Sequence, residues 1–144
     1  MLRRKVENDL LKWKRANNKT ALLVTGARQV GKTASIRQFG KTYYDNFIEI
    51  NFITDINADN IFSGSLRADD IILNLSAFVK KALVPGKTLI FLDEIQECPN
   101  ARTAIKFLVE DGRFDYIESG SLLGINYKEI PSLPVGYEEI LQMY

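Results

Sequence analysis

The 144-residue sequence has no histidine, one cysteine and no long hydrophobic run. Without histidine the chain has no imidazole acid or base and no His-ligated zinc site, so its chemistry must use carboxylates, hydroxyls, lysine and a bound metal. Cys98 has no second cysteine to pair with. An internal disulfide is therefore excluded, which fits a reducing compartment.

No apolar run is long enough to cross a bilayer, because the longest ones span only residues 21–24 and 89–92. The basic residues near the N-terminus are not followed by an apolar signal core. We therefore expect a cytoplasmic protein without membrane association. A hydrophobic content of 46% and a charged content of 26% are ordinary for a globular protein, and the length suits a single domain over 1–144.

Positive charge is concentrated at the N-terminus, although the whole chain carries only +1. Residues 1–19 contain seven basic and two acidic residues, a net charge of +5, which leaves −4 for the remainder. Four apolar residues recur there at helical spacing: Leu2, Val6, Leu10 and Trp13. This pattern predicts a helix over 1–17 that docks on the core, with Trp13 inside. We favour cations that face water; contact with nucleic acid or a nucleotide is the alternative.

Strand and helix patterns alternate along the rest of the chain. Apolar or alternating segments predict strands at 20–25, 46–52, 88–94, 114–119 and 138–144. Helical patterns cover 32–39, 68–83 and about 101–110, with a loop over 54–65 and a turn at 85–86. Strands that alternate with helices form right-handed βαβ units. The expected fold is α/β, a mostly parallel five-stranded sheet with helices on both faces.

Residues 26–33 fit G-x-x-x-x-G-K-[ST], the phosphate-binding P-loop. The motif follows an expected strand and opens an expected helix, which is the context that such a loop requires. Its glycines permit close backbone approach, while successive amides and the helix N-terminus face anionic oxygens. Lys32 is expected to reach the β- and γ-phosphates, and Thr33 to ligate Mg²⁺. A glycine-rich turn with an exposed lysine is the alternative.

We therefore expect a nucleoside triphosphate to bind along the whole motif and the next helical residue. The residues are Gly26, Ala27, Arg28, Gln29, Val30, Gly31, Lys32, Thr33 and Ala34. Lys32 also counts as catalytic, because its charge can stabilise the transferred phosphate. Arg28 can contact phosphate or pair with a neighbouring acid, and we favour the structural role.

Four apolar residues followed by Asp93 and Glu94 form a Walker B pattern about sixty residues after the P-loop. Asp93 is expected to hold Mg²⁺ through a water, and Glu94 to polarise the water that attacks the γ-phosphate. The alternative for Glu94 is a solvated acid at a strand end. The chain lacks the D-x-x-G and N-K-x-D motifs of a GTPase, and residues 122–144 contain no arginine for a kinase lid. ATP hydrolysis is the better interpretation.

Three motifs end expected strands, and the carboxyl ends of parallel strands meet at one edge of the sheet. We therefore expect 26–33, 93–94 and 119–121 to converge on one pocket. Ser119 and Ser121 stand where a polar residue can sense the γ-phosphate or bond the lytic water; a tight turn is the alternative. Gln96 can orient water or cap the following loop, which the sequence leaves open. Cys98 is expected to be an inert thiol, because no base is apparent beside it.

Five segments together carry a resemblance to known proteins: Trp13, 26–33, 92–99, 120–124 and 134–136. The sequence resembles the bacterial and archaeal AAA-type ATP-binding proteins, related to the archaeal ATPase and STAND branches of the P-loop superfamily. The resemblance covers nearly the whole chain and implies strand order 5-1-4-3-2, with the P-loop after the central strand. In many relatives the residue after Pro-Val-Gly is basic and acts as an arginine finger or sensor, whereas this chain has Tyr137.

Such relatives are longer, with a helical region and a C-terminal domain that is often nuclease-like in fold. This chain stops inside an apolar strand, so we expect a part of a longer protein whose C-terminal domain is a partner. The expected function is Mg²⁺-dependent hydrolysis of ATP to ADP and phosphate. The alternative is a nucleotide-dependent switch with negligible hydrolysis, associated with DNA through that domain. A homo-oligomer is a further partner prediction.

Overall fold

The computed structural model describes residues 2–17, 19–26, 31–120 and 136–143. Its helices are α1 (Leu2–Lys14), α2 (Lys32–Tyr43), α3 (Ala68–Val79) and α4 (Pro99–Asp111), with 3₁₀ turns at η2 (Ala58–Phe62) and η3 (Ile95–Glu97). Its strands are β1 (Ala21–Thr25), β2 (Asn46–Asn51), β3 (Thr88–Asp93), β4 (Asp115–Gly120) and β5 (Glu138–Gln142). All neighbouring strands pair in parallel in the order β2-β3-β4-β1-β5. This is the order 5-1-4-3-2 read from the other edge, so the expected fold class and strand order are confirmed. The P-loop motif, however, follows β1, which lies beside the edge strand β5, and not the middle strand β4.

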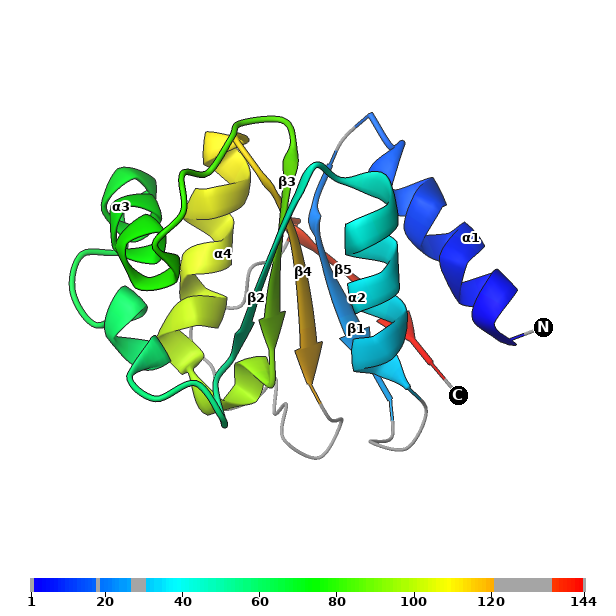
Figure 1. Cartoon of the computed structure of the whole chain (residues 1–144), viewed down its shortest axis with the longest axis horizontal. Coiled ribbons are helices and arrows are strands. Elements are labelled where there is room, and N and C mark those ends of the chain that lie inside the picture. The colour runs from blue at the N-terminus through cyan, green and yellow to red at the C-terminus, as the bar shows by residue number, and fades with distance from the viewer. Residues whose placement is uncertain (1, 18, 27–30, 121–135, 144) are drawn as a thin grey trace.

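Helices cover both faces of the sheet (Figure 1). On one face α1 and α2 pack in a buried cluster that includes Leu10, Ile36 and Phe91. On the other face α3 and α4 form a cluster that includes Leu75 and Ile105. Strands β1 and β3 are buried along their whole length, as expected for central parallel strands between two helical layers. The carboxyl ends of β1, β3 and β4 all lie at the lower edge in Figure 1.

The N-terminal helix docks on the core as its apolar spacing predicts. Val6, Leu10 and Trp13 are buried. The indole Nε1–H of Trp13 donates a hydrogen bond of 2.8 Å to the carbonyl oxygen of Thr20, which ties the helix to the start of β1. Trp13 therefore has the core position that we favoured, and α1 ends at Lys14, three residues before the predicted boundary.

Helix α2 runs four residues beyond its predicted end at Phe39, straight through Gly40. The rings of Phe39 and Tyr43, one helical turn apart, pack with centroids 5.2 Å apart and support this extra turn. Glycine is needed at position 40 because the ring of Phe47 lies against its Cα; a Cβ would come within 2.2 Å of that ring. The glycine thus reflects helix–sheet packing rather than a helix stop.

Substituting Gly40→Ala is expected to destabilise the fold by about 1–2 kcal/mol. Alanine favours helix over glycine by about 1 kcal/mol, but an approach as close as 2.2 Å to the Phe47 ring places the overpacking cost in the upper part of its usual range, at about 2–3 kcal/mol. Urea denaturation followed by circular dichroism measures the difference. Gly64→Ala is the control, because a Cβ there has no atom within 4 Å. A Gly40→Ala protein as stable as the wild type would contradict this packing argument.

Other boundaries also differ from the predicted ones by a few residues, and two of the differences have a local cause. Helix α3 ends at Val79 rather than at 83, because Lys80 takes a left-handed conformation with φ of 56°. Helix α4 begins two residues early, at Pro99, since proline suits the first helical turn. Strand β3 ends at Asp93, one residue before the predicted end. The loop expected over 54–65 contains the 3₁₀ turn η2.

Candidate nucleotide-binding site

Lys32 begins α2 and points to the carboxyl edge of the sheet. Gly31 before it has φ of 75°, a backbone conformation that favours glycine. The Lys32 ammonium donates hydrogen bonds of 3.0 Å to the carbonyl oxygen of Gly26, at the end of β1, and 3.1 Å to that of Gly120, the last residue of β4. The side chain is only 8% exposed. A buried cation thus lies between the first glycine of the P-loop motif and β4.

Asp93 is the centre of a polar cluster at the same edge. The Thr33 hydroxyl donates to its Oδ2 at 3.1 Å, and the Ser119 hydroxyl donates to its Oδ1. Asn51 Nδ2 lies 3.4 Å from the same Oδ2. The carboxylate therefore has donors from α2, β4 and β2, and it is 5% exposed. The structure brings Lys32, Thr33, Asp93 and Ser119 together, as the strand-end argument anticipates.

Asn51 is a member of this cluster that sequence reasoning missed. It is the last residue of β2 and pairs in register with Asp93. Its Oδ1 accepts hydrogen bonds from the amides of Ile53, at 2.8 Å, and Thr54, at 3.1 Å, so it also shapes the loop after β2. The available signal was its place: a polar residue at the end of a strand that neighbours the Walker B strand.

Glu94 leaves the line of β3 with a left-handed backbone, φ 58° and ψ 49°. A non-glycine residue in this region costs on the order of 1 kcal/mol, and such residues gather at functional sites. The Gln96 side-chain amide donates a hydrogen bond of 2.8 Å to Glu94 Oε1. Gln96, whose role the sequence leaves open, therefore contacts the Glu94 carboxylate, and both side chains are half-buried.

The donor set suits a magnesium nucleotide. A hydroxyl and a carboxylate are oxygen ligands of the kind that Mg²⁺ takes, and Mg²⁺ commonly completes its shell with waters and phosphate oxygens. In the described part of the chain no group of three or more Asp, Glu, Cys or His residues is arranged to hold a metal alone. A site with two protein oxygens therefore fits a metal that arrives with phosphate.

A family model described as "AAA domain" matches residues 18–144. The chain belongs to the AAA domain family. Membership makes it part of a family of nucleotide-binding ATPases, as the resemblance implied. The comparison with curated proteins gives no match.

Solved structures similar to this AAA domain share its fold at low identity. The ORC1 protein of Aeropyrum pernix in complex with DNA matches with a TM-score of 0.61 and 17% identity, over 99% of this chain and 44% of that one. A chain of Drosophila ORC bound to AT-rich DNA and Cdc6 matches with a TM-score of 0.60 and 10% identity, over 99% of this chain and 55% of that one. A chain of Drosophila ORC bound to DNA matches with a TM-score of 0.60 and 11% identity, over 99% of this chain and 91% of that one. The domain thus spans about half the length of the first two.

Several predicted site residues fall outside the described part of the AAA domain. They are Ala27, Arg28, Gln29, Val30 and Ser121. Ala34 lies in the first turn of α2 and is exposed. Cys98 is buried before α4, and burial raises the pKa of its thiol, which fits the expected inert side chain.

Tyr137 lies far from the site in its own chain. Its carbonyl oxygen accepts a hydrogen bond from the amide of Ala21, which is the first residue of β1. The P-loop motif begins at the other end of this strand, after its last residue, Thr25. At about 3.3 Å per residue, the strand separates the two ends by roughly 13–16 Å. A hydrogen bond to Glu110 raises the pKa of the Tyr137 phenol. A side chain at position 137 therefore cannot stabilise phosphate charge in the same domain.

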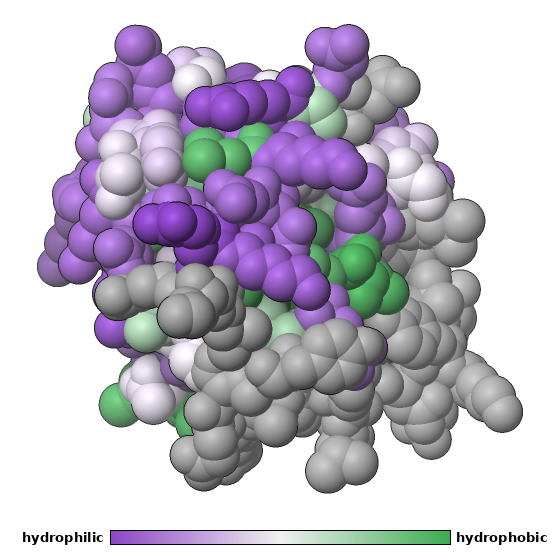
Figure 2. Space-filling model, turned by 90° about the vertical axis from the view of Figure 1, so that its right-hand side faces the viewer, coloured by the Kyte–Doolittle hydropathy of each residue, from purple (hydrophilic) through white to green (hydrophobic). Residues whose placement is uncertain are grey.

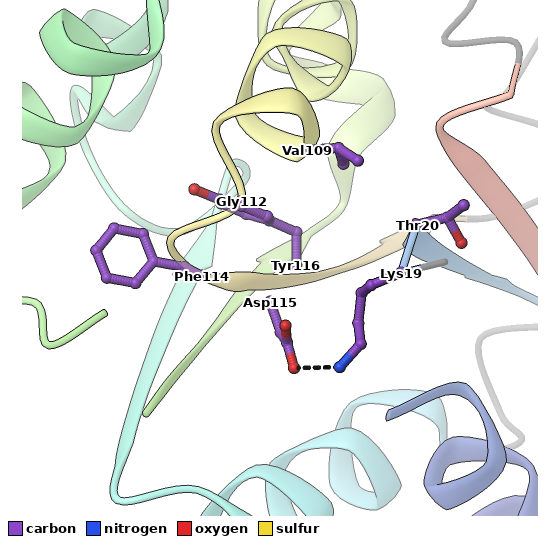
Figure 3. Close-up of a pocket in the computed structure, with 7 residues that line it drawn as sticks. All are labelled: Lys19, Thr20, Val109, Gly112, Phe114, Asp115 and Tyr116. Carbon is purple, nitrogen blue, oxygen red and sulfur yellow. Dashed lines mark hydrogen bonds and ion pairs between the residues drawn. The ribbon is translucent and has the colours of Figure 1, made fainter. Parts of the chain in front are cut away.

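A small cavity near the starts of β1 and β4 is distinct from this site. It measures about 60 Å³, and Lys19 and Asp115 form an ion pair of 3.2 Å in its lining (Figure 3). Ligand pockets usually measure about 300–1,000 Å³, so this one is too small for a nucleotide. Among the described residues no helix is long and apolar enough to cross a membrane.

Proposed function

We propose that this AAA domain binds ATP with Mg²⁺ and hydrolyses it to ADP and phosphate. One observation carries the proposal: Lys32 and Thr33 at the start of α2 meet Asp93 and Ser119 at the ends of β3 and β4. A cation, a metal-type oxygen pair and a helix N-terminus at one edge of a parallel sheet match the needs of a polyphosphate. The absence of N-K-x-D from the sequence favours adenine over guanine.

Different residues of the chain would bind the phosphates and the metal. Lys32 would exchange its carbonyl partners for β- and γ-phosphate oxygens, while the amides of the P-loop motif hold the phosphate chain. Thr33 and Asp93, already in contact, would hold the metal directly and through water, respectively. When bound, Mg²⁺ supplies charge neutralisation on the β- and γ-oxygens.

Glu94 would accept the proton of the attacking water, and Gln96 would hold one carboxylate oxygen of Glu94 in place. Ser119, and Ser121 by sequence, would sense the γ-phosphate or bond the lytic water. In this arrangement Ser119 links the γ-phosphate side of the site to Asp93. Asn51 would orient the same carboxylate from β2.

A nucleotide-dependent switch with negligible hydrolysis is the second candidate, and the place of Tyr137 favours it. Transition-state charge on a transferred phosphate often needs an arginine finger, which can be worth about 10³–10⁵ in rate. The position that is basic in many relatives lies at the opposite edge of the sheet here. Such a charge would have to come from elsewhere in the chain or from a neighbouring subunit.

Turnover by the wild-type protein decides between these two, and replacing Glu94 with glutamine tests the residue assigned as the base. Glu94→Gln keeps the hydrogen bond with Gln96 but removes the base, so hydrolysis is expected to fall about 10²–10⁴-fold with ATP affinity unchanged. Release of inorganic phosphate measures turnover, and titration with a non-hydrolysable analogue measures binding. Glu97→Gln is the matched control, because Glu97 is exposed in the 3₁₀ turn that follows Glu94. Equal turnover in Glu94→Gln and wild type would remove Glu94 from the mechanism.

The other partner and location assignments stay predictions. A further C-terminal domain, a homo-oligomer and a cytoplasmic setting rest on the sequence and the family. Association with DNA is suggested by the DNA-bound structures that share the fold. At 17% identity or less, the similarity to those structures shows only that the fold is shared, so any DNA contact must be argued from this chain's own surface.

A further inference from the structure

Helix α1 presents a cationic face to solvent. Arg4, Lys5 and Lys12 of the helix are exposed, opposite the buried Val6, Leu10 and Trp13. Arg15 is also exposed, and its amide donates a hydrogen bond of 3.0 Å to the carbonyl oxygen of Leu11, which continues the helical turn. Figure 2 views this side of the molecule and shows mostly hydrophilic residues among those that it colours.

These four cations differ from Lys14 and Lys19, whose charges are engaged. The Lys14 ammonium lies 4.9 Å from the centroid of the Tyr44 ring, and that of Lys19 lies over the Trp13 ring and pairs with Asp115. For Arg4, Lys5, Lys12 and Arg15 the described structure contains no ion pair. The acids of this segment, Glu7 and Asp9, are half-buried at the flanks of the helix. The outer face is therefore a cationic stripe with no ion-paired acid among the described residues, although Lys12 shares a groove with Asp9 and Glu139.

We propose that the outer face of α1 binds the phosphate backbone of a nucleic-acid duplex. Arg4 and Arg15 are eleven residues apart, which at 1.5 Å per residue gives a straight stripe of roughly 16 Å. A duplex carries one phosphate charge per about 1.7 Å of axis, so each of the four cations has phosphates within its reach. Because such contacts involve no base edge, the binding is independent of sequence.

The surface does not suit a membrane, the other large anionic partner. A helix that lies on a bilayer needs an exposed apolar face beside its basic one. The described side chains on the apolar face of α1, Val6, Leu10 and Trp13, are buried in the core, and the exposed large apolar residues of the described chain all lie outside α1. The net charge of −4 over residues 20–144 also repels a polyanion from the rest of the domain, so α1 would face it.

This interaction goes beyond the proposed ATPase function and does not depend on it. Helix α1 packs on the same face of the sheet as α2 through Val6, Leu10 and Ile36, and its cations point away from that contact. The stripe therefore lies outside the site formed by Lys32 and Asp93. Nucleic-acid binding and nucleotide binding can then be measured separately on the same variants.

The test is fluorescence anisotropy of labelled duplex DNA and duplex RNA of mixed sequence, titrated with the chain between about 50 and about 200 mM salt. Four phosphate contacts predict a slope of log K against log salt of about −3.6, which is a loss of roughly a hundredfold over this range. A variant with glutamine at Arg4, Lys5, Lys12 and Arg15 should lose most of this binding. Glutamine keeps nearly the same helix propensity as lysine and arginine, so α1 should still form.

A second variant with glutamine at Lys80, Lys81, Lys87 and Lys106 is the control, because these lysines are exposed elsewhere and the change in net charge is the same. It should keep the wild-type slope. Equal losses in both variants, or equal binding to anionic vesicles or polyglutamate at the same salt, would overturn the proposal. Equal affinity for DNA and RNA supports contact with phosphate. Circular dichroism of both variants should match the wild type, which confirms that they fold whether or not the domain binds ATP.

Discussion

Substituting Lys32→Ala is expected to abolish measurable binding of ATP. Its ammonium is buried, and its partners in the described structure, the carbonyl oxygens of Gly26 and Gly120, hold it at the edge where the P-loop motif begins. Each hydrogen bond from a charged group is worth about 1.5–3 kcal/mol, so the loss of two phosphate contacts should cost about 3–6 kcal/mol. That corresponds to an affinity loss of at least about a hundredfold.

Calorimetric titration with a non-hydrolysable ATP analogue, with and without Mg²⁺, measures this effect. Lys41→Ala is the matched control, since Lys41 is an exposed lysine in the last turn of the same helix. Circular dichroism of both variants checks that the fold is kept. An ATP affinity in Lys32→Ala equal to that of Lys41→Ala would refute the assignment of the phosphate site.

Much of this site could be predicted because its motifs are local. The P-loop motif needs only a strand before it and a helix after it, and Asp93 needs only the end of an apolar strand. Parallel topology then brings the strand ends together, so the contact of Thr33 with Asp93 follows from two short segments and a fold rule. The residues that make these contacts are contiguous with the patterns that reveal them.

What the sequence did not reveal depends on contacts between distant segments. Asn51 joins the cluster only because β2 pairs with β3 in a register that sets it against Asp93. Gly40 is read as a helix end unless the ring of Phe47 is known to pack on it. The left-handed backbone of Glu94 is a local fact, but glutamate has no preference for that conformation that a sequence pattern could report.

A buried charged cluster on the α4 side of the sheet is the least predictable feature, since it joins β4, β5 and α4. Arg102 Nη2 donates a hydrogen bond of 2.7 Å to Glu138 Oε1, and the two side chains are 1% and 6% exposed, respectively. Glu118 beside them is fully buried, and within the described residues neither of its carboxylate oxygens has a hydrogen-bond donor. Burial, and then the charge of Glu138, raises the pKa of Glu118 well above its ordinary value, against the opposing effect of Arg102.

Substituting Arg102→Met is therefore expected to destabilise the domain by about 3–5 kcal/mol at neutral pH, because it leaves Glu138 buried without its cation beside a second acid. The exposed pair of Arg37 with Glu49 gives the control: Arg37→Met should cost at most about 1 kcal/mol. Adding Glu138→Gln to Arg102→Met should restore most of the loss, since a neutral buried pair needs no counter-charge. A loss in Arg102→Met no larger than that in Arg37→Met would contradict this account.

The raised pKa of Glu118 also sets the direction in which the stability of the fold changes with pH. A carboxyl group whose pKa is higher in the folded state contributes its full stability below its unfolded pKa of about 4.3 and loses it as the pH rises through the folded pKa. Wild-type stability should thus decline on the alkaline side by up to about 1.4 kcal/mol per pH unit within that window. Glu118→Gln, which keeps the shape and removes the proton equilibrium, should flatten the decline in urea denaturation series at several pH values. An unchanged decline in Glu118→Gln would mean that another titratable group controls it.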